Sequence, residues 1–300
     1  MQEHTFVFRV SGRDSVKNLL SSIFDANGVE ESEAYSFARE TMQKIILNGL
    51  SRGQFFKKAA FHGGTALRIL HGINRYSEDL DFTLFEKDPD FKLERYLTYA
   101  ESEIRSYGVT VSTKVRDKVV GNIRTGDVKA NYREMAFEIG FPNGLVESLH
   151  RDEVIRVKID VNTDPPKGAG YDKLAMTEPL NYYLCAMDLP SMFAGKIGAI
   201  LGRRWVNRVK GRDLYDYLWY VEKEVPINME YLRSNLVAQE IIQQEDEFTI
   251  KTLRQLLSDK FETIKYASAL EDVKEYLLER APVGWCPETF KDTLGWLYTQ

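Results

Sequence analysis

The segment 154–162 restricts the fold more than any other part of the chain, because apolar and polar side chains alternate along it. Its odd positions from 155 to 161 are apolar, and its even positions from 156 to 162 are Arg, Lys, Asp and Asn. A period of two residues is typical of a β-strand with one face against a core. The polar face, which carries Asp160, is either simply exposed to solvent or part of a functional site.

Patterns elsewhere predict an α+β fold with a mixed sheet in the N-terminal part and an all-helical C-terminal part. Further strands are expected at 59–61, 79–85, 109–115 and 132–141, and helices at 14–27, 30–50 and 91–107. The turn residues at 164–168 (Asp-Pro-Pro-Lys-Gly) interrupt the pattern, and most of the chain from Glu178 onward is predicted helical, including the apolar stretch around Cys185. The helices expected there are 191–204, 211–220, 229–240, 249–261 and 270–280. We therefore predict two domains, 1–175 and 176–300.

Composition excludes several classes of protein. With 43% hydrophobic residues, including 16 Phe, 16 Tyr and 4 Trp, the chain can bury a sizeable core. Its formal charge is −5, so a site for nucleic acid must be a local patch and not a general excess of basic residues. The chain has only 2 cysteines, no secretory leader pattern and no apolar run of ~18 residues, which predicts a cytoplasmic protein without a membrane segment.

The sharpest local motif is Arg-Tyr-Ser-Glu-Asp-Leu-Asp-Phe at 75–82. In a strand, Asp79 and Asp81 share one face about 7 Å apart, while Leu80 and Phe82 face the core. Two such carboxylates repel each other unless solvent surrounds them or a hard divalent cation bridges them. The motif therefore indicates either a metal site or a solvated edge strand.

Upstream of this pair, Gly63, Gly64 and Thr65 form a predicted turn between a strand and a helix. Glycines let a ligand approach the backbone closely, and the free N–H groups of a helix N-terminus favour a phosphate. An ordinary strand-to-helix turn explains the same residues. Next to Asp79 and Asp81, however, the turn matches what a nucleoside triphosphate with Mg²⁺ requires.

A third carboxylate would strengthen the metal site. If the strand of Asp160 lies beside that of Asp79 and Asp81, Asp160 completes a metal-binding triad and can accept a proton from an attacking hydroxyl. Glu138, in the strand expected at 132–141, is the rival for this position.

The segment 189–212 is locally basic within an acidic chain. It contains no Asp or Glu, but it holds Lys196, Arg203, Arg204, Arg208, Lys210 and Arg212. Such a segment suits phosphates or an RNA backbone, and a solvated helical face is the alternative. Asp213 follows near a helix start, where a capping role alone would explain it.

Taken together, these residues resemble the AbiEii/AbiGii toxin family. Its members are nucleotidyltransferases of the DNA polymerase beta-like superfamily, found in abortive-infection systems of phage defence and in type IV toxin–antitoxin systems. The resemblance runs in order through the segments 61–67, 75–82, 157–161, 193–201 and 210–216. The first 50 and the last 80 residues contain no motif that matches.

The resemblance implies a role for each matching residue. Asp79, Asp81 and Asp160 would bind Mg²⁺ or Mn²⁺, and Lys158 would form the second active-site motif together with Asp160. The triphosphate would lie on Gly63, Gly64 and Thr65. Lys196 would contact its phosphates from the helical domain, and Asp213 would be the last active-site residue. Gly64 stands where the superfamily often has Ser, which leaves the hydroxyl to Thr65.

The activity implied is transfer of a nucleotide from a nucleoside triphosphate to an acceptor hydroxyl. The acceptor would be RNA, such as the tRNA acceptor end, bound by the basic segment 196–212, and the partner would be a cognate antitoxin without a stable complex. One alternative is a non-catalytic RNA- or protein-binding regulator on the same fold. The other is an aspartate-nucleophile phosphatase, which needs an apolar strand before Asp79, where this chain has the mostly polar segment 72–78.

Overall fold

The computed structural model describes residues 31–117, 121–205, 209–278 and 282–299. One mixed sheet of seven strands runs through it in the order β3-β4-β5-β2-β1-β7-β6. The strands are β1 Ala59–His62, β2 Leu80–Leu84, β3 Val111–Val115, β4 Ile123–Asn131, β5 Val154–Asn162, β6 Tyr171–Met176 and β7 Tyr182–Met187. β2 is parallel to β5 and β1 is parallel to β7, while the other neighbouring pairs are antiparallel.

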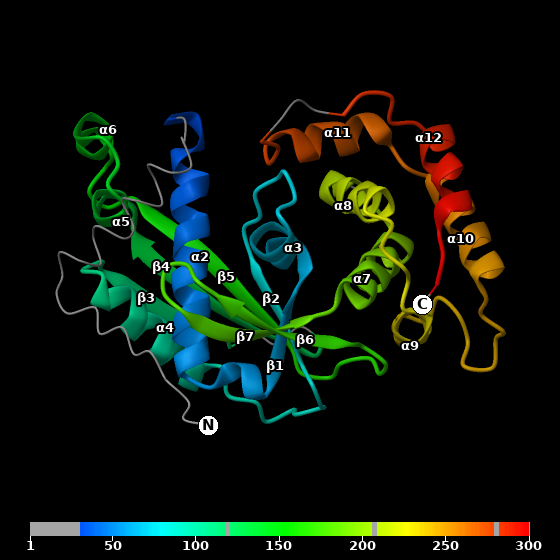
Figure 1. The fold of residues 1–300 in the computed structure, drawn as a ribbon, viewed down its shortest axis with the longest axis horizontal. Helices are drawn as coiled ribbons and strands as arrows, with labels where there is room; N and C mark the ends of the chain where they lie inside the picture. The colour runs from blue at the N-terminus through cyan, green and yellow to red at the C-terminus, as the bar shows by residue number, and fades with distance from the viewer. Residues whose placement is uncertain (1–30, 118–120, 206–208, 279–281, 300) are drawn as a thin grey trace, which may run out of the picture.

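The helices of the N-terminal part flank the sheet, and those of the C-terminal part of the chain form a separate group beside it (Figure 1). Those within the sheet region are η1 Glu31–Glu33, α2 Ala34–Arg52, η2 Phe55–Lys57, α3 Gly63–His71, α4 Glu94–Ser106, α5 Tyr132–Ile139 and α6 Asn143–Ser148. Those that follow it are α7 Leu189–Gly202, α8 Gly211–Glu222, α9 Met229–Ala238, α10 Ile250–Glu262, α11 Tyr266–Lys274, α12 Pro287–Asp292 and η3 Thr293–Trp296. Of the helices described, none is long and apolar enough to cross a membrane.

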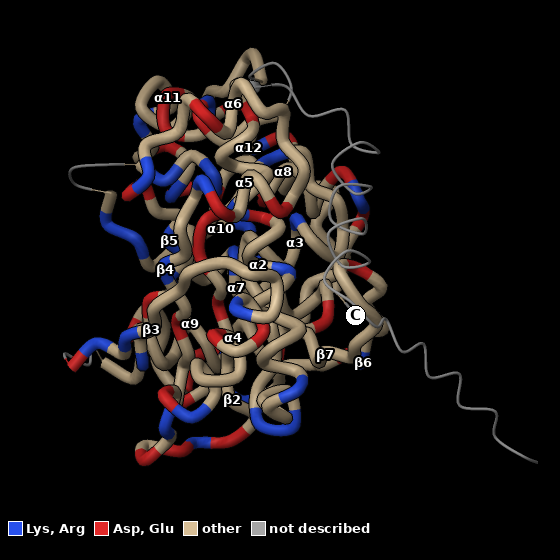
Figure 2. Tube along the Cα trace, turned by 90° about the vertical axis from the view of Figure 1, so that its left-hand side faces the viewer, with Lys and Arg blue, Asp and Glu red and all other residues tan. Residues whose placement is uncertain are grey.

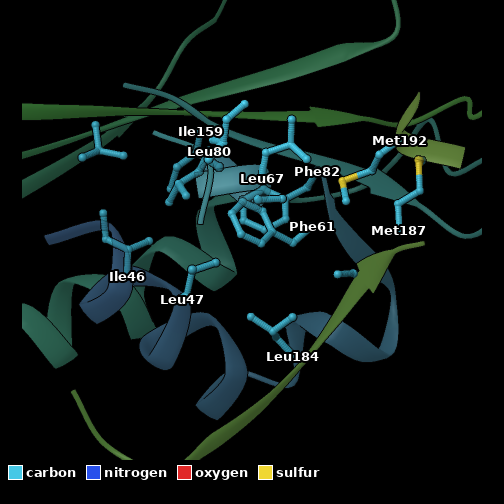
Figure 3. Close-up of a cluster of buried hydrophobic side chains, with 14 of the residues drawn as sticks. Ile46, Leu47, Phe61, Leu67, Leu80, Phe82, Ile159, Leu184, Met187 and Met192 are labelled. Atoms are coloured by element: carbon cyan, nitrogen blue, oxygen red, sulfur yellow. The ribbon is translucent and has the colours of Figure 1, made fainter. Parts of the chain in front are cut away.

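The core lies between the sheet and the helices around it (Figure 3). Figure 3 shows side chains of α2, α3 and α7 meeting those of the central strands: Ile46, Leu47, Phe61, Leu67, Leu80, Phe82, Ile159, Leu184, Met187 and Met192. At about 25 cal/mol per Å² of apolar surface removed from water, this burial is the main force that holds the layers together.

The alternating segment 154–162 forms β5, as its period predicts. Ile155, Val157, Ile159 and Val161 are fully buried, and they face the side of the sheet that α2 covers. The polar side chains between them therefore point to the opposite face, where Asp160 lies.

The segment 132–141, expected as a strand, is the helix α5. The side chain of Asn131 accepts a hydrogen bond from the Glu134 N–H and caps the helix, which ends at Gly140 with a φ of 93°. Tyr132, Met135, Ala136 and Ile139 repeat at helical spacing and are buried. The strand that precedes it, β4, lies in a segment for which the sequence patterns predict no strand.

The helical prediction for the chain after Glu178 is wrong at residues 182–187, which form β7. The side chains of Tyr182, Leu184 and Ala186 alternate into the core, so Cys185 lies on a strand and not on a helix. The patterns do not predict β6 either. The α+β class with a mixed sheet is confirmed, and from Leu189 onward the described chain is helical. The division into domains at residue 175 stays a prediction, and the helix expected at 14–27 lies outside the described residues.

Candidate active site

Three carboxylates meet at two neighbouring strands: Asp81 lies on β2, Asp79 directly precedes β2, and Asp160 lies on β5. In the parallel pair of β2 and β5, Asp81 is aligned with Asp160. The Lys158 ammonium contacts Asp79 Oδ2 and Asp160 Oδ2, each at 3.0 Å. The Thr125 hydroxyl donates to Asp160 Oδ1 at 2.7 Å and fixes this side chain from β4. The sheet thus brings together Asp79, Asp81, Asp160 and Lys158, as the sequence predicts.

Negative charge accumulates around Asp81. Burial and the neighbouring carboxylates of Asp79 and Asp160 raise the pKa of Asp81 to about 6. Although burial would lower the pKa of Lys158, its hydrogen bonds to Asp160 and Asp79 raise it. A cation is therefore favoured between these carboxylates, and Lys158 supplies one.

The glycine turn lies directly against this cluster. Gly63 begins α3 with a φ of +81°, and a Cβ at this position would lie 2.7 Å from Asp81 Oδ2. A Cβ at Gly64 would lie 2.6 Å from Arg75 Nη2 and 3.0 Å from Ser77 Oγ. A serine at position 64 would therefore collide with the Arg75 guanidinium, which explains why Gly stands where Ser is common at this turn.

The expected phosphate contact of Thr65 is not supported. Its side chain is fully buried, and its hydroxyl donates to the backbone carbonyl of Asp79. Thr65 does not line the cavity described below, whereas Gly63 and Gly64 do. Thr65 therefore holds the start of β2 in place.

Replacing Gly63 by Ala should reduce the nucleotide transfer that the resemblance implies by about tenfold or more, and it should destabilise the fold by about 1–2 kcal/mol. The new Cβ would have to displace the Asp81 carboxylate, and the left-handed backbone disfavours any L-side chain. Steady-state rates and urea unfolding measure the two effects. Gly144→Ala is the control, because a Cβ at Gly144 meets nothing within 4 Å. Wild-type turnover in Gly63→Ala would contradict the close approach to Asp81.

A second cluster of charges comes from α7 and α8. Lys196 Nζ lies 2.8 Å from Asp213 Oδ1 and 2.8 Å from Asp216 Oδ2, and Arg203 Nη1 lies 2.8 Å from Asp213 Oδ2. Although burial would lower the pKa of Lys196, Asp213 and Asp216 raise it. Lys196 therefore stays charged on the inner side of α7.

Arg75 connects this second cluster to the strand of Asp79 and Asp81. Its guanidinium donates to both carboxylate oxygens of Asp216, at 2.6 and 2.7 Å, and both side chains are buried. Burial would raise the pKa of Asp216, but Arg75 and Lys196 lower it. Sequence reasoning missed this pair as part of the site. The i, i+3 spacing of Asp213 and Asp216 on one helix face could have indicated Asp216.

Both clusters face one cavity of about 400 Å³ between the sheet and α7–α8. Its walls include the predicted site residues Gly63, Gly64, Asp79, Asp81, Asp160, Lys196 and Asp213, and also His62, Arg75, Ser77, Arg203, Lys210 and Arg212. Burial lowers the pKa of His62 to about 4, so its imidazole is neutral at pH 7. One side of the cavity is thus rich in carboxylates and the other in cations.

Two expectations about neighbouring residues change. Glu138, the rival of Asp160, lies on α5, outside this cavity. In the basic segment 196–212, Lys196 and Arg203 are bound to Asp213, and Arg212 lies 3.4 Å from Glu78. The described cations of this segment that line the cavity are Lys196, Arg203, Lys210 and Arg212. They suit a small anionic substrate in the cavity better than an extended RNA.

The residues present fit a divalent cation. Asp79, Asp81 and Asp160 offer carboxylate oxygens, the donors that Mg²⁺ and Mn²⁺ prefer, and the Lys158 ammonium already bridges two of them. As these side chains stand, no group of three or more His, Cys, Asp or Glu in the described chain is arranged to hold a metal ion. Lys158 would have to turn aside for all three carboxylates to share one.

A comparison with protein families decides the assignment. The model of the family described as "Nucleotidyl transferase AbiEii toxin, Type IV TA system" matches residues 45–294. The chain belongs to this family. It is therefore an AbiEii-type nucleotidyltransferase of a toxin family, and the activity implies a nucleoside triphosphate as substrate. The match includes every predicted site residue and extends well beyond the motifs, into both flanking regions.

A solved toxin structure shares the fold. MenT4, a nucleotidyltransferase toxin from Mycobacterium tuberculosis, is 15% identical, with a TM-score of 0.54 over 95% of this chain and 89% of that chain. A putative nucleotidyltransferase from H. pylori is 18% identical, with a TM-score of 0.48 over 89% of this chain and 93% of that chain. The comparison with curated protein sequences gives no significant match.

Proposed function

We propose that this AbiEii-family protein transfers a nucleotide from a nucleoside triphosphate to a hydroxyl of RNA, in a reaction that depends on Mg²⁺ or Mn²⁺. The observation that carries the proposal is the single cavity in which the carboxylates of β2 and β5 face the glycine turn and the cations of α7 and α8. The cations and the glycine turn can bind the phosphates of the substrate, and the carboxylates can bind a divalent ion.

Each wall of the cavity has its own task in this proposal. The backbone of Gly63 and Gly64 and the ammonium of Lys196 bind the triphosphate, whose charge Lys210 and Arg212 help to neutralise. Burial and the nearby Arg203 guanidinium lower the pKa of Lys210, so a phosphate there would restore its ordinary affinity for a proton. Asp213 orients Lys196 through the 2.8 Å ion pair.

Asp79, Asp81 and Asp160 would hold the divalent ion. When bound, it would supply Lewis-acid stabilisation of the charge that develops on the reacting phosphate. Asp160 can accept the proton of the attacking hydroxyl, because it lines the cavity and its side chain is held there by the hydrogen bond from Thr125. Lys158, released from these carboxylates, can then contact phosphate oxygens.

The direct test incubates the full-length protein with each α-labelled nucleoside triphosphate, total cellular RNA and MgCl₂. We expect label to enter RNA with at least one nucleotide, EDTA to stop the transfer, and Mg²⁺ or Mn²⁺ to restore it. Lys196→Ala should lower kcat/KM by about 100-fold or more, as loss of an electrostatic clamp does. Asp213 and Asp216 keep Arg203 and Arg75 as partners, so this variant should remain folded.

The control for Lys196→Ala is Lys265→Ala, which removes an exposed lysine of the helical part. Lys265→Ala should transfer nucleotides as the wild type does. If Lys196→Ala were equally active, the cavity would not extend functionally to α7. If label entered no RNA with any of the nucleotides, RNA would be wrong as the acceptor.

A further inference from the structure

The face of the sheet that carries Asp160 continues outward across β5, β4 and β3. Residues aligned across antiparallel strands share a face, and this alignment joins Ser112 to Lys129 and Arg156, and Lys114 to Asp127 and Lys158. Lys114, Arg116, Lys129 and Arg156 are exposed on it. We call these four residues, with Asp127, the basic sheet face.

The helices on these strands cover the other side. A Cβ at Gly126 would meet Leu97 of α4, and the Thr113 hydroxyl donates to Glu101 of α4 at 2.7 Å. Both residues alternate with those of the basic sheet face, so α4 packs on the opposite side. Figure 2 shows Lys and Arg segments gathered along β3, β4 and β5.

Asp127 orients two of the cations. Arg116 donates to it through Nε and Nη2, at 2.9 and 3.0 Å, and Arg156 through Nε and Nη2, at 2.9 and 2.7 Å. These bonds hold the pKa of Asp127 at about 2. Each guanidinium has five N–H groups, so three on each remain for another acceptor. The arrangement presents fixed donors of the kind that bind phosphate oxygens.

The position of this face suggests what it binds. In the sheet order, Asp81 on β2 and Asp160 on β5 lie between the glycine turn that follows β1 and the part of the basic sheet face on β4 and β3. A triphosphate on the turn therefore approaches the carboxylates from one side, and the basic sheet face leads up to them from the other. The hydrogen bond to Asp127 is the largest cause that raises the pKa of Arg116, and the negative charges of Asp160 and Asp79 raise it as well.

We propose that the basic sheet face binds the sugar–phosphate backbone of the acceptor RNA and leads its hydroxyl to Asp160; this inference rests on the proposed function. From Arg156 to Asp160 the strand rises about 13 Å, which corresponds to about four nucleotides of a stacked strand. The face carries four exposed cations and one carboxylate in a chain whose net charge is −5. It thus provides the local patch that an acidic chain needs to hold RNA.

The test compares two variants of the full-length protein that each lose three positive charges. Lys114→Gln/Lys129→Gln/Arg156→Gln changes the basic sheet face, whereas Lys223→Gln/Lys251→Gln/Lys265→Gln changes the helical part. The probe is a fluorescein-labelled 12-nucleotide RNA with a free 3′ hydroxyl, titrated at 50 to 200 mM NaCl. The first variant should bind at least about tenfold more weakly, with a salt slope shallower by about 2. The second variant should bind as the wild type does.

Further measurements keep the outcome clear. Lys114→Gln/Lys129→Gln changes two exposed lysines that form no ion pair with any described residue, and it replaces the triple variant if that one fails to fold. Wild-type RNA affinity in a folded sheet-face variant would overturn the inference. If that variant had also lost binding to poly-glutamate, the result would indicate an acidic protein partner in place of RNA. RNA binding is measured without nucleoside triphosphate, so a failure of nucleotide transfer is detected separately.

Discussion

Asp81→Asn should abolish nucleotide transfer and at the same time stabilise the metal-free fold. The carboxylate lies beside Gly63 and is aligned with Asp160, where a divalent ion would be held. Loss of a ligand to such an ion removes several kcal/mol of transition-state stabilisation, or about 1,000-fold or more in rate. The same carboxylate is half-buried among like charges, so the uncharged amide should suit the folded state better.

The stability effect depends on pH in a defined direction. The pKa of Asp81 is about 6 in the fold, against an ordinary value of 3.8. Between these pH values the folded protein binds more protons than the unfolded chain. The contribution of Asp81 to the free energy of unfolding is therefore most favourable below about pH 4 and is lost as the pH rises through 6. Relative to Asp81→Asn, the free energy of unfolding of the wild type should fall by about 2–3 kcal/mol between pH 4 and pH 7.

Urea unfolding in EDTA, at several pH values, measures this difference. Asp172→Asn is the control, because Asp172 is an exposed aspartate on β6, and it should show neither effect. Adding MgCl₂ at pH 7 should stabilise the wild type and leave Asp81→Asn unchanged, because only the wild type keeps the full set of carboxylates. Near wild-type transfer by Asp81→Asn would refute the assignment of this residue, whatever its stability.

Asp216→Ala should destabilise the protein by about 3–5 kcal/mol, far more than the loss of an ion pair on the surface. Arg75 and Asp216 are 2% and 0% exposed, and their double hydrogen bond joins the segment before β2 to α8. Removing the carboxylate leaves the Arg75 guanidinium buried without its counter-charge and takes one of the two ion pairs from Lys196. Such an uncompensated buried charge is the costly case.

Urea unfolding at pH 7 measures this loss, with Glu271→Ala as the matched control. Glu271 pairs with Lys274 on the surface of α11, and removing it should change stability by less than about 0.5 kcal/mol. Arg75→Met/Asp216→Leu should recover part of the stability but not the activity, because Asp216 also positions Lys196. A loss below about 1 kcal/mol in Asp216→Ala would mean that the pair does not hold the sheet and α8 together.

Local patterns are sufficient for the elements that carry the carboxylates. The alternation in 154–162 predicts β5, the pattern at 79–85 predicts β2 with Asp81 on it, although Asp79 lies just before the strand, and Gly63-Gly64 predicts the turn into α3. Each of these signals is contained within about ten residues, where side-chain period and backbone preference act directly. The segment 132–141 shows the limit of such patterns, because its aromatic and branched residues suit a strand, while a cap at Asn131 starts a helix.

The amino-acid sequence alone predicts the residues that we propose to carry the chemistry: the carboxylates, the turn glycines and the basic residues of segment 196–212, together with the resemblance to the family. The partners of these residues follow only from the packing of distant segments. That packing places Lys158 between Asp79 and Asp160, buries the Thr65 hydroxyl against a carbonyl, and pairs Arg75 with Asp216 across 141 positions of the chain. A charge in the interior binds whichever opposite charge the packing brings near it, and that choice depends on the order of strands and helices rather than on neighbouring residues.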